Sequence, residues 1–250
     1  MKKMFLFILV TLFLGVSYSS NAAATNASVP VLLYHVVSTN PDPNNQYQYS
    51  LTEFKKQMDY LKTNGYTTLS IDQYYSIINK TVSMPSKPVL LTFDDCTSDF
   101  YTNVYPILKQ YGMKATQFAV SNWIDTGGHM TTSQLKTVYA NGIDVQNHTT
   151  NHSSLTSLTH DQKYVAINDA TTKIRSITNK SPVYCAYPNA SYDTDTVLIL
   201  KNLGYKTGFK VGGGLSKDTS DKYALPRSMI LNGDILTVFI RKLLDRKSVV

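Results

Sequence analysis

The fold is decided by residues 88–120, which read PVLLTFDDCTSDFYTNVYPILKQYGMKATQFAV. The largely apolar run from Pro88 to Phe93 shows no alternation, which predicts a strand buried on both faces. Ser98 to Tyr111 predicts a helix that Gly112 ends, and Ala115 to Val120 predicts the next strand. A strand, a helix and a second strand in this order form the βαβ unit of a parallel sheet.

The same alternation continues on both sides of this unit. Further strands are predicted at Val29–Val37, Thr67–Ile71, Ile143–Gln146, Val183–Tyr187, Thr207–Val211 and Leu225–Ile230. Further helices are predicted at Ser50–Asn64, Asp72–Asn79, Thr132–Ala140, Thr159–Ile177, Asp193–Asn202 and Ile235–Leu244, the first with Ser50 and Glu53 as a capping box. Seven to eight such units predict an α/β fold, a distorted or incomplete (β/α) barrel. A doubly wound open sheet is the alternative.

The first residues have the layout of a secretory signal peptide. Met1 to Lys3 is basic, Met4 to Val16 is almost entirely apolar, and small residues lead up to Ala24. We therefore predict a signal peptide over residues 1–24, one domain over residues 25–250, and a secreted, extracellular or cell-wall location. The alternative is a membrane anchor, but a span needs about 20 apolar residues. We expect no stable anchor after cleavage.

Composition excludes some classes of partner. The net charge of the 250 residues is +7, and Lys2 and Lys3 of the predicted signal contribute two of these charges. The remaining basic residues are spread along the chain without interleaved aromatic residues, so we expect no nucleic-acid partner. The glycine-rich phosphate-binding patterns G-x-G-x-x-G and G-x-x-x-x-G-K-[ST] are absent from the sequence, which argues against nucleotides. We expect a monomer.

Polar residues follow or end several of the predicted strands, where parallel α/β folds place their sites. Asp94 and Asp95 close the strand that begins at Pro88. Adjacent carboxylates point in different directions, so one can hold a metal ion while the other acts as a base. The alternative is a pair that caps the following helix.

His148 and His152 follow the strand at Ile143–Gln146 and lie four residues apart. At this spacing two imidazoles reach one point on a helical turn or tight loop, as a metal site requires. The alternative is a pair of surface histidines. Two imidazoles and one carboxylate leave coordination positions open, which is typical of catalytic metal sites. Such ligands suit zinc, and also cobalt or nickel.

The motifs together resemble one family. Thr92–Asp95 and His148–His152 are similar to the first two motifs of polysaccharide deacetylases, the NodB-homology domains of carbohydrate esterase family 4. Tyr34-His35 resembles the arrangement in the exopolysaccharide (biofilm) deacetylases of that family. Cys185–Pro188 resembles the third motif, and Leu225–Arg227 the late segment that carries an arginine. The resemblance implies a hydrolase that removes N-acetyl groups from an N-acetylglucosamine polysaccharide such as peptidoglycan, chitin-like chains or poly-N-acetylglucosamine.

The resemblance also implies roles for individual residues. The metal ligands would be Asp95, His148 and His152. Asp94 would act as the general base, and Arg227 would pair with it. His35 would protonate the departing amine, and the backbone N–H of Asn189 would stabilise the oxyanion. On the residues alone, His35 could equally be a core histidine and Arg227 a surface residue at a strand end.

The sequence departs from the family pattern at two places. Cys96 stands where the family usually has Gly after the paired Asp, and Asn189-Ala190 replaces the usual Tyr-Gly of the third motif. Cys96 and Cys185 both flank the predicted site, so we hypothesise that they lie close together, either as a disulfide or as two free thiols. Two other functions stay open, an O-acetyl esterase on a xylan-like glycan and a glycan-binding relative with little activity.

Overall fold

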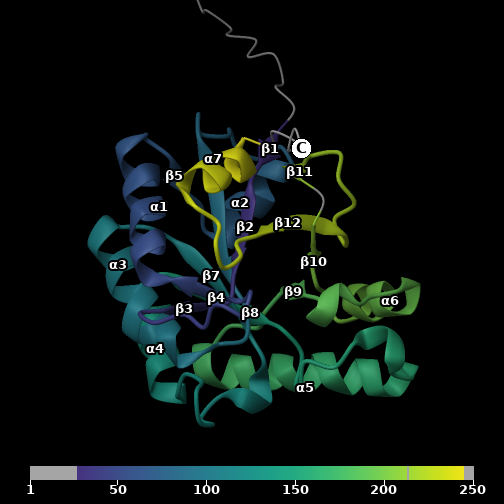
Figure 1. Ribbon diagram of the computed structural model, residues 1–250. Coiled ribbons are helices and arrows are strands. Elements are labelled where there is room, and N and C mark those ends of the chain that lie inside the picture. Colours follow the sequence, from purple (N-terminus) through teal and green to yellow (C-terminus); the bar gives the residue numbers. More distant parts are fainter. Residues whose placement is uncertain (1–26, 213, 245–250) are drawn as a thin grey trace, which may run out of the picture.

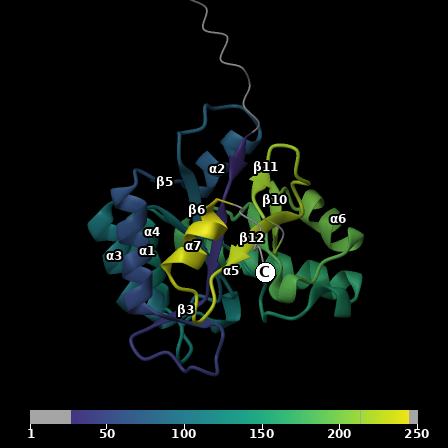
Figure 2. The same cartoon turned by 45° about the horizontal axis from the view of Figure 1, so that its top comes forward.

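The protein folds around a closed barrel of parallel strands (Figures 1 and 2). The computed structural model describes residues 27–212 and 214–244, so the predicted signal peptide lies outside the described residues. In the order in which they pair, the seven barrel strands within this part are β2 (Val31–Tyr34), β12 (Leu225–Met229), β10 (Thr207–Val211), β9 (Tyr184–Ala186), β8 (Ile143–Asn147), β7 (Ala115–Ala119) and β6 (Pro88–Phe93). The pairing of β2 with β6 closes the ring. The predicted (β/α) barrel is confirmed, and the open sheet is wrong.

Helices cover the outside of the barrel. They are α1 (Leu51–Thr63), α2 (Ile71–Ile78), α3 (Tyr105–Tyr111), α4 (Thr132–Ala140), α5 (His160–Thr178), α6 (Thr194–Asn202) and α7 (Leu236–Leu243). In both ribbon views α1, α3 and α4 lie on one side, and α5 and α6 lie on another. Short 3-10 turns lie at Ser121–Trp123, Leu155–Ser157 and Pro188–Ala190. Two of these turns, the first and the last, directly follow the barrel strands β7 and β9.

Short strands outside the ring complete the sheet structure. β5 (Thr67–Thr68) pairs with the first residues of β6. β1 (Ser28–Val29) pairs antiparallel with β11 (Ser216–Lys217), and β3 (Val36–Ser38) pairs in parallel with β4 (Gln48–Ser50). The sequence did not predict β11 or β4, because strands of two or three residues are too short for a periodic pattern.

The core explains why β6 is apolar along its whole length. All six of its residues are buried. Val89, Leu91 and Phe93 belong to the cluster that includes the buried faces of α1, α3 and α4, whereas Leu90 belongs to a second cluster with Phe118 and side chains of the other barrel strands. Successive strand residues point to opposite faces. Each face of β6 is therefore covered, one by helices and the other by the barrel interior.

Two predicted helix starts differ in detail from the observed ones. The helix predicted over Ser98–Tyr111 begins at Ser98 as predicted, but it is π-helical at Phe100–Val104 before it continues as α3. Pro106 lacks the N–H that would bond to the carbonyl four residues back, and the N–H of Tyr105 instead reaches Phe100. Ser50 is the N-cap of α1 but its side chain makes no capping bond, so that predicted capping box is wrong.

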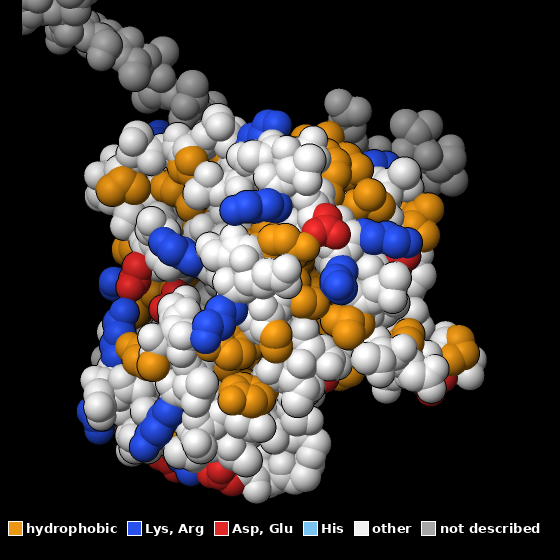
Figure 3. Space-filling view, turned by 90° about the vertical axis from the view of Figure 1, so that its left-hand side faces the viewer, with side chains coloured by type: hydrophobic (Ala, Val, Ile, Leu, Met, Phe, Trp, Pro, Cys, Tyr) orange, Lys and Arg blue, Asp and Glu red, His pale blue; other side chains and the backbone are white. Residues whose placement is uncertain are grey.

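The described residues include no helix that is long and apolar enough to cross a membrane. On the face covered by α1, α3 and α4, the Lys and Arg side chains stand apart from one another among neutral and apolar groups (Figure 3). This distribution agrees with the spread of basic residues along the sequence.

Candidate metal centre and active site

The strand ends bring the predicted site residues together at one end of the barrel. The backbone ladder continues past the strands, because Asp94 N–H donates to the Tyr34 carbonyl and His148 N–H donates to the Ala119 carbonyl, both at 3.0 Å. A pocket of about 490 Å³ opens at this end. It is lined by His35, Val36, Tyr47, Asp94, Asp95, His148, His152, Tyr187, Asn189, Ala190, Val211 and Met229. Arg227 lies beneath the pocket and is completely buried.

Three side chains converge as a metal site requires. One donor atom each from Asp95, His148 and His152 lies within 4.8 Å of the other two. Asp95 Oδ1 is 3.6 Å from the Nε2 atom of each histidine. Two donors bound tetrahedrally to one ion at 2.0–2.2 Å would lie about 3.3–3.6 Å apart. The spacing is therefore too long for hydrogen bonds and suits a shared cation.

The environment of the Asp95 carboxylate also favours a metal ion. Its Oδ1 is buried and finds no hydrogen-bond partner among the described residues. Burial, and then the charge of Asp94, raises the pKa of Asp95 to about 7, although Arg227 opposes the shift. A buried carboxylate without a partner is costly. A cation held at this position would remove that cost, so these residues fit a metal ion.

Both histidines are neutral, and His148 presents a free lone pair toward Asp95. Burial lowers the pKa of His148 to about 4 and also lowers that of His152, so both rings are neutral at pH 7. His148 Nδ1 lies 2.8 Å from the Ala186 carbonyl. A carbonyl only accepts, so Nδ1 carries the proton and Nε2 is left unprotonated toward Asp95. This second contact also fixes the orientation of the ring.

Asp94 is held by a different partner. The Arg227 guanidinium donates Nη1 to Asp94 Oδ1 and Nη2 to Oδ2, each at 2.7 Å, in a buried bidentate pair. Burial alone would raise the pKa of Asp94, but Arg227 and then His148 outweigh it and lower the pKa to about 2. Asp94 is therefore ionised at neutral pH. Its Oδ2 lies 3.6 Å from His148 Nε2, beside the metal position.

Backbone strain is concentrated in the loops that carry these residues. Of the nine non-glycine residues with positive φ in the described part of the chain, six lie on the three loops after β6, β8 and β9. They are Asp95, Cys96, Thr149, His152, Asn189 and Ala190, with φ between 54° and 72°. Such conformations cost energy for side chains with a Cβ and persist where the surroundings enforce them.

The loop from His148 to His152 is fastened by neighbours that the sequence did not indicate. Ser121 N–H and Asn122 N–H donate to the Thr149 and Thr150 carbonyls at 3.0 and 3.1 Å. The buried Asn147 side chain accepts the Thr149 N–H at 2.6 Å. The contacts of Ser121 and Asn122 join segments that are remote along the chain, so no local pattern could have revealed them.

Trp123 is a second missed neighbour of the site. Its ring stacks on that of the ligand candidate His152, with centroids 5.5 Å apart and an angle of 26° between the planes. His129 lies on the same indole at 5.0 Å. His129 is half-buried in this position. The chain has one Trp, and that rarity was the only available signal.

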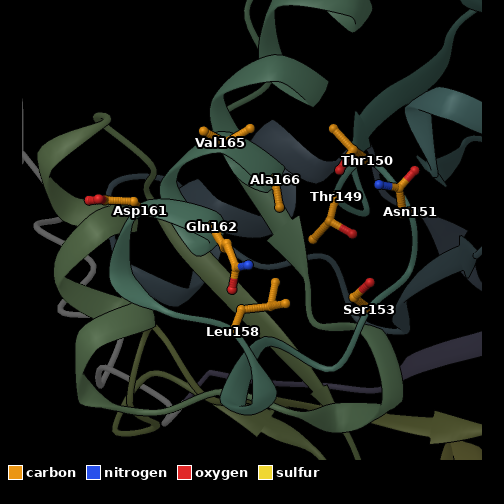
Figure 4. A pocket seen from close by; sticks show the side chains of 9 residues that line it. All are labelled: Thr149, Thr150, Asn151, Ser153, Leu158, Asp161, Gln162, Val165 and Ala166. Carbon is orange, nitrogen blue, oxygen red and sulfur yellow. The ribbon is translucent and has the colours of Figure 1, made fainter.

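A second pocket, of about 350 Å³, lies against the same histidine loop. Thr149, Thr150, Asn151 and Ser153 contribute one wall, and Leu158 with the first turns of α5 contributes the other (Figure 4). The side chains of Thr149, Gln162 and Leu158 point toward one another in this view. The predicted metal ligands line the pocket of about 490 Å³ and not this one.

The two cysteines do not form a disulfide. Both are buried and free, and they belong to different core clusters. Burial raises the pKa of each thiol to about 12, which leaves both unreactive at neutral pH. The hypothesis of a bracing disulfide is therefore wrong. The alternative of two free, buried thiols is the observed one.

The fold and the donor atoms define a class, a seven-stranded parallel barrel with an Asp-His-His metal-site geometry at the carboxyl ends of its strands. The family is shown by comparison with known proteins. The family model described as polysaccharide deacetylase matches residues 81–208. The chain belongs to the polysaccharide deacetylase family, also called NodB-homology or carbohydrate esterase family 4.

Individual relatives agree with this assignment. The chain is 31% identical over 207 residues to YxkH of Bacillus subtilis, which is assigned to the polysaccharide deacetylases, covering 83% of this chain and 73% of YxkH. It is 27% identical to the poly-beta-1,6-N-acetyl-D-glucosamine N-deacetylase of Staphylococcus aureus, over 74% of this chain and 68% of that one. The solved deacetylase PplD of Streptococcus pyogenes superposes with a TM-score of 0.83 at 27% identity, over 88% of this chain and 99% of PplD.

Proposed function

We propose that this protein is a secreted, metal-dependent N-deacetylase that hydrolyses the acetamide groups of an N-acetylglucosamine polysaccharide. The observation that carries the proposal is the pair of neighbouring carboxylates in different environments. Asp95 faces two neutral imidazoles without a hydrogen-bond partner among the described residues, whereas Asp94 is clamped by Arg227. One carboxylate is thereby suited to a metal ion and the other to proton transfer.

Asp95, His148 and His152 would hold one divalent cation, with zinc, cobalt and nickel as the candidates. When bound, the ion would act as a Lewis acid on the acetamide carbonyl and lower the pKa of the attacking water. The three residues leave part of the coordination sphere to water and substrate, as a catalytic site needs.

Asp94 is the proposed general base. Its carboxylate borders the metal position, is ionised, and would accept the proton of the attacking water. Because its pKa is low, it would pass that proton on readily. Arg227 is a positioning residue in this scheme, since it holds both oxygens of Asp94 and has no exposed surface of its own.

His35 and Asn189 would complete the proton transfer and charge stabilisation. His35 lines the pocket, and its Nδ1 is buried without a partner among the described residues. Burial lowers the pKa of His35, which makes the protonated ring a stronger donor to the departing amine. Asn189 lines the same pocket, and its backbone N–H would donate to the oxyanion of the tetrahedral intermediate.

The substrate class rests on the relatives and on the shape of the site. The Staphylococcus aureus relative is named for poly-beta-1,6-N-acetyl-D-glucosamine, so we propose that polymer, peptidoglycan or a chitin-like chain as the substrate. The pocket is open at the barrel end and large enough for a sugar with its acetamide. The signal-peptide layout of residues 1–24 supports secretion. Secretion would bring the protein to its substrates, because polysaccharides of this class lie outside the membrane.

The proposal is tested by measuring acetate release from β-1,4- and β-1,6-linked N-acetylglucosamine oligomers, before and after treatment with a chelator. Activity should be lost on chelation and return with zinc, cobalt or nickel. Asp94→Asn should keep its bound metal and lose activity by at least about 100-fold. Asp95→Asn should lose both, as seen by elemental analysis of the purified protein.

A parallel assay on acetylated xylan separates amide from ester hydrolysis. Faster acetate release from xylan than from the amino-sugar oligomers would replace the proposed substrate with an O-acetylated glycan. Activity that survives both chelation and Asp94→Asn would rule out the mechanism. Tight oligomer binding with no acetate release from any substrate would identify a binding protein.

A further inference from the structure

Tyr47 contributes an aromatic ring to the wall of the site pocket, and the chemistry proposed above gives this ring no role. Tyr47 stands at the end of the loop between β3 and β4, which projects from the barrel (Figure 2). Seven large hydrophobic side chains are exposed within the described residues. Among these, Tyr47, at 42% exposure, is the one that lines the pocket with the predicted metal ligands. An aromatic ring that is exposed inside this pocket offers a face that a bound ligand could cover.

The Tyr47 ring is next to the proposed proton donor. Its centroid lies 4.9 Å from that of His35, with the planes tilted by 57°. The Tyr47 hydroxyl makes no hydrogen bond within the described residues, unlike that of Tyr34 or Tyr187, which bond inside the fold. The free hydroxyl and the half-exposed ring together leave a polar edge and an apolar face open to solvent.

Hydrogen bonds hold the backbone around Tyr47 in place. The Tyr47 carbonyl accepts the Val36 N–H at 3.2 Å, and the Tyr47 N–H donates to Asn45 Oδ1 at 3.0 Å. Asn232, from the segment after β12, donates its own N–H to the Gln46 carbonyl at 2.9 Å and its side chain to the Asp42 carbonyl at 2.9 Å. The loop is thereby tied to a remote part of the chain. A wall fixed in this way is pre-organised for binding.

We infer that Tyr47 is a stacking platform for a second sugar of the polymer, the neighbour of the unit whose acetamide is cleaved. The inference rests on the proposed function and names a specificity-determining residue for it. Sugar rings present C–H groups on their faces, which pack on aromatic rings, while their hydroxyls bond to polar edges such as the Tyr47 hydroxyl. Since His35 must meet the departing amine, the ring packed against His35 meets the adjoining unit. The enzyme should therefore prefer oligomers to single sugars.

The test compares Tyr47→Ala with Tyr47→Phe and with Tyr164→Ala. Tyr164 is a matched control, because it has the same 42% exposure but lies on α5 and does not line the pocket. For an N-acetylglucosamine tetramer, Tyr47→Ala should raise KM on the order of tenfold, with a much smaller effect on kcat. For the methyl glycoside of N-acetylglucosamine, which has no second sugar, the change should be clearly smaller. Tyr47→Phe keeps the ring but loses the hydroxyl, so its KM for the tetramer should lie between those of the wild type and Tyr47→Ala. Tyr164→Ala should stay close to the wild type.

Other results would overturn the inference. If Tyr47→Ala lowers kcat equally for the tetramer and the methyl glycoside and shifts the pH profile, the ring only orients His35. A KM for the tetramer that is unchanged in Tyr47→Ala excludes a stacking role. Calorimetric titration of the tetramer into the Asp94→Asn background, with and without Tyr47→Ala, measures stacking independently of turnover. An equal Kd in the two proteins would refute the platform even if the proposed reaction itself proved wrong.

Discussion

At the scale of single residues, the site is built on a difference between two neighbours. Asp94 and Asp95 are adjacent in sequence, yet the first has an Arg227 clamp and the second has no partner among the described residues. Asp95 has a φ of 72°, so the chain leaves the extended conformation after β6, and both carboxylates come within 3.6 Å of His148 Nε2 while only Asp94 meets Arg227. The sequence could reveal the pair but not the partners, because Arg227 is 133 residues away.

The buried ion pair between Arg227 and Asp94 predicts a large loss of stability when the Arg227 side chain is replaced by an uncharged one. Arg227→Met leaves the Asp94 charge buried without compensation and should lower the free energy of unfolding by about 3–5 kcal/mol. The double variant Arg227→Met/Asp94→Asn removes that charge and should recover part of the loss. Urea unfolding of the wild type, of the single variants Arg227→Met and Asp94→Asn, and of the double variant measures both effects. Equal stability of Arg227→Met and the double variant would show that the cost comes from lost packing against Phe118, whose ring centre lies 5.3 Å from the guanidinium carbon.

At the scale of elements, the sequence predicted the barrel strands well and their surroundings poorly. Strands β6 and β10 and helix α4 have the predicted boundaries, because runs of apolar residues and glycine stops are local signals. The starts of α1 and α2 were misjudged, since Ser50 makes no capping bond and Ser70 with Gln73 forms the capping box of α2, which begins before the predicted start at Asp72. Tyr47, Trp123 and their roles depend on exposure and on contacts between loops, which no local pattern encodes.

Position 208 in β10 should not tolerate any side chain larger than that of glycine. A Cβ added there would lie 1.9 Å from the hydroxyl oxygen of Tyr187 and 2.4 Å from Cζ of its ring. Tyr187 is almost fully buried, lines the site pocket and donates to the Tyr223 carbonyl at 2.8 Å. Gly208→Ala should therefore lower the free energy of unfolding by about 1–3 kcal/mol and reduce activity by displacing that ring. Thermal unfolding and acetate release measure the two effects.

The control for this prediction is Tyr187→Val, alone and with Gly208→Ala. The smaller side chain leaves room for the new Cβ, so the double variant should lose less stability than the two single losses added together. Strictly additive losses would mean that Gly208 is needed for a reason other than the space taken by Tyr187.

The start of α6 predicts a pH dependence. Asp193 caps this helix by accepting the Thr196 N–H at 2.8 Å, and its other oxygen accepts from Lys163 at 2.6 Å. Burial alone would raise the pKa of Asp193, but Lys163 and Thr196 outweigh it and lower the pKa to about 2 from its ordinary 3.8. The ionised form therefore adds stability above about pH 4, and this stability is lost as the pH falls through about 2.

Two substitutions separate the cap from the charge. Asp193→Ala should cost about 1–2 kcal/mol at pH 7, whereas Asp193→Asn keeps a capping oxygen and should cost clearly less, because the ion pair is partly exposed. The gap between wild type and Asp193→Asn should shrink as the pH is lowered from 4 to 2 in urea-unfolding series. A gap that stays constant over this range would show that the Asp193 charge contributes nothing.

At the scale of the whole molecule, the segment that matches the family model is shorter than the segment that forms the barrel. The matched residues 81–208 include the predicted metal ligands but neither β2, which precedes His35, nor β12, which carries Arg227. These two strands pair with each other, and β2 also pairs with β6. The barrel is closed by strands near the two ends of the described chain, so the matched segment depends on both strands to complete its hydrogen bonding.

Closure by the two ends predicts the effect of shortening the chain. A protein ending at Val211 lacks β12, so β2 and β10 become open edges, and Asp94 loses its buried counter-charge. It should show no cooperative unfolding transition and release no acetate.

A protein ending at Asn232 keeps the closed ring and loses α7 with the buried Phe239 and Leu243. It should still unfold cooperatively, with a free energy of unfolding lower by about 3–6 kcal/mol. Near-ultraviolet circular dichroism during urea unfolding distinguishes the two. Cooperative unfolding of the shorter protein would mean that β12 is an accessory strand, and that the site is organised without a closed barrel.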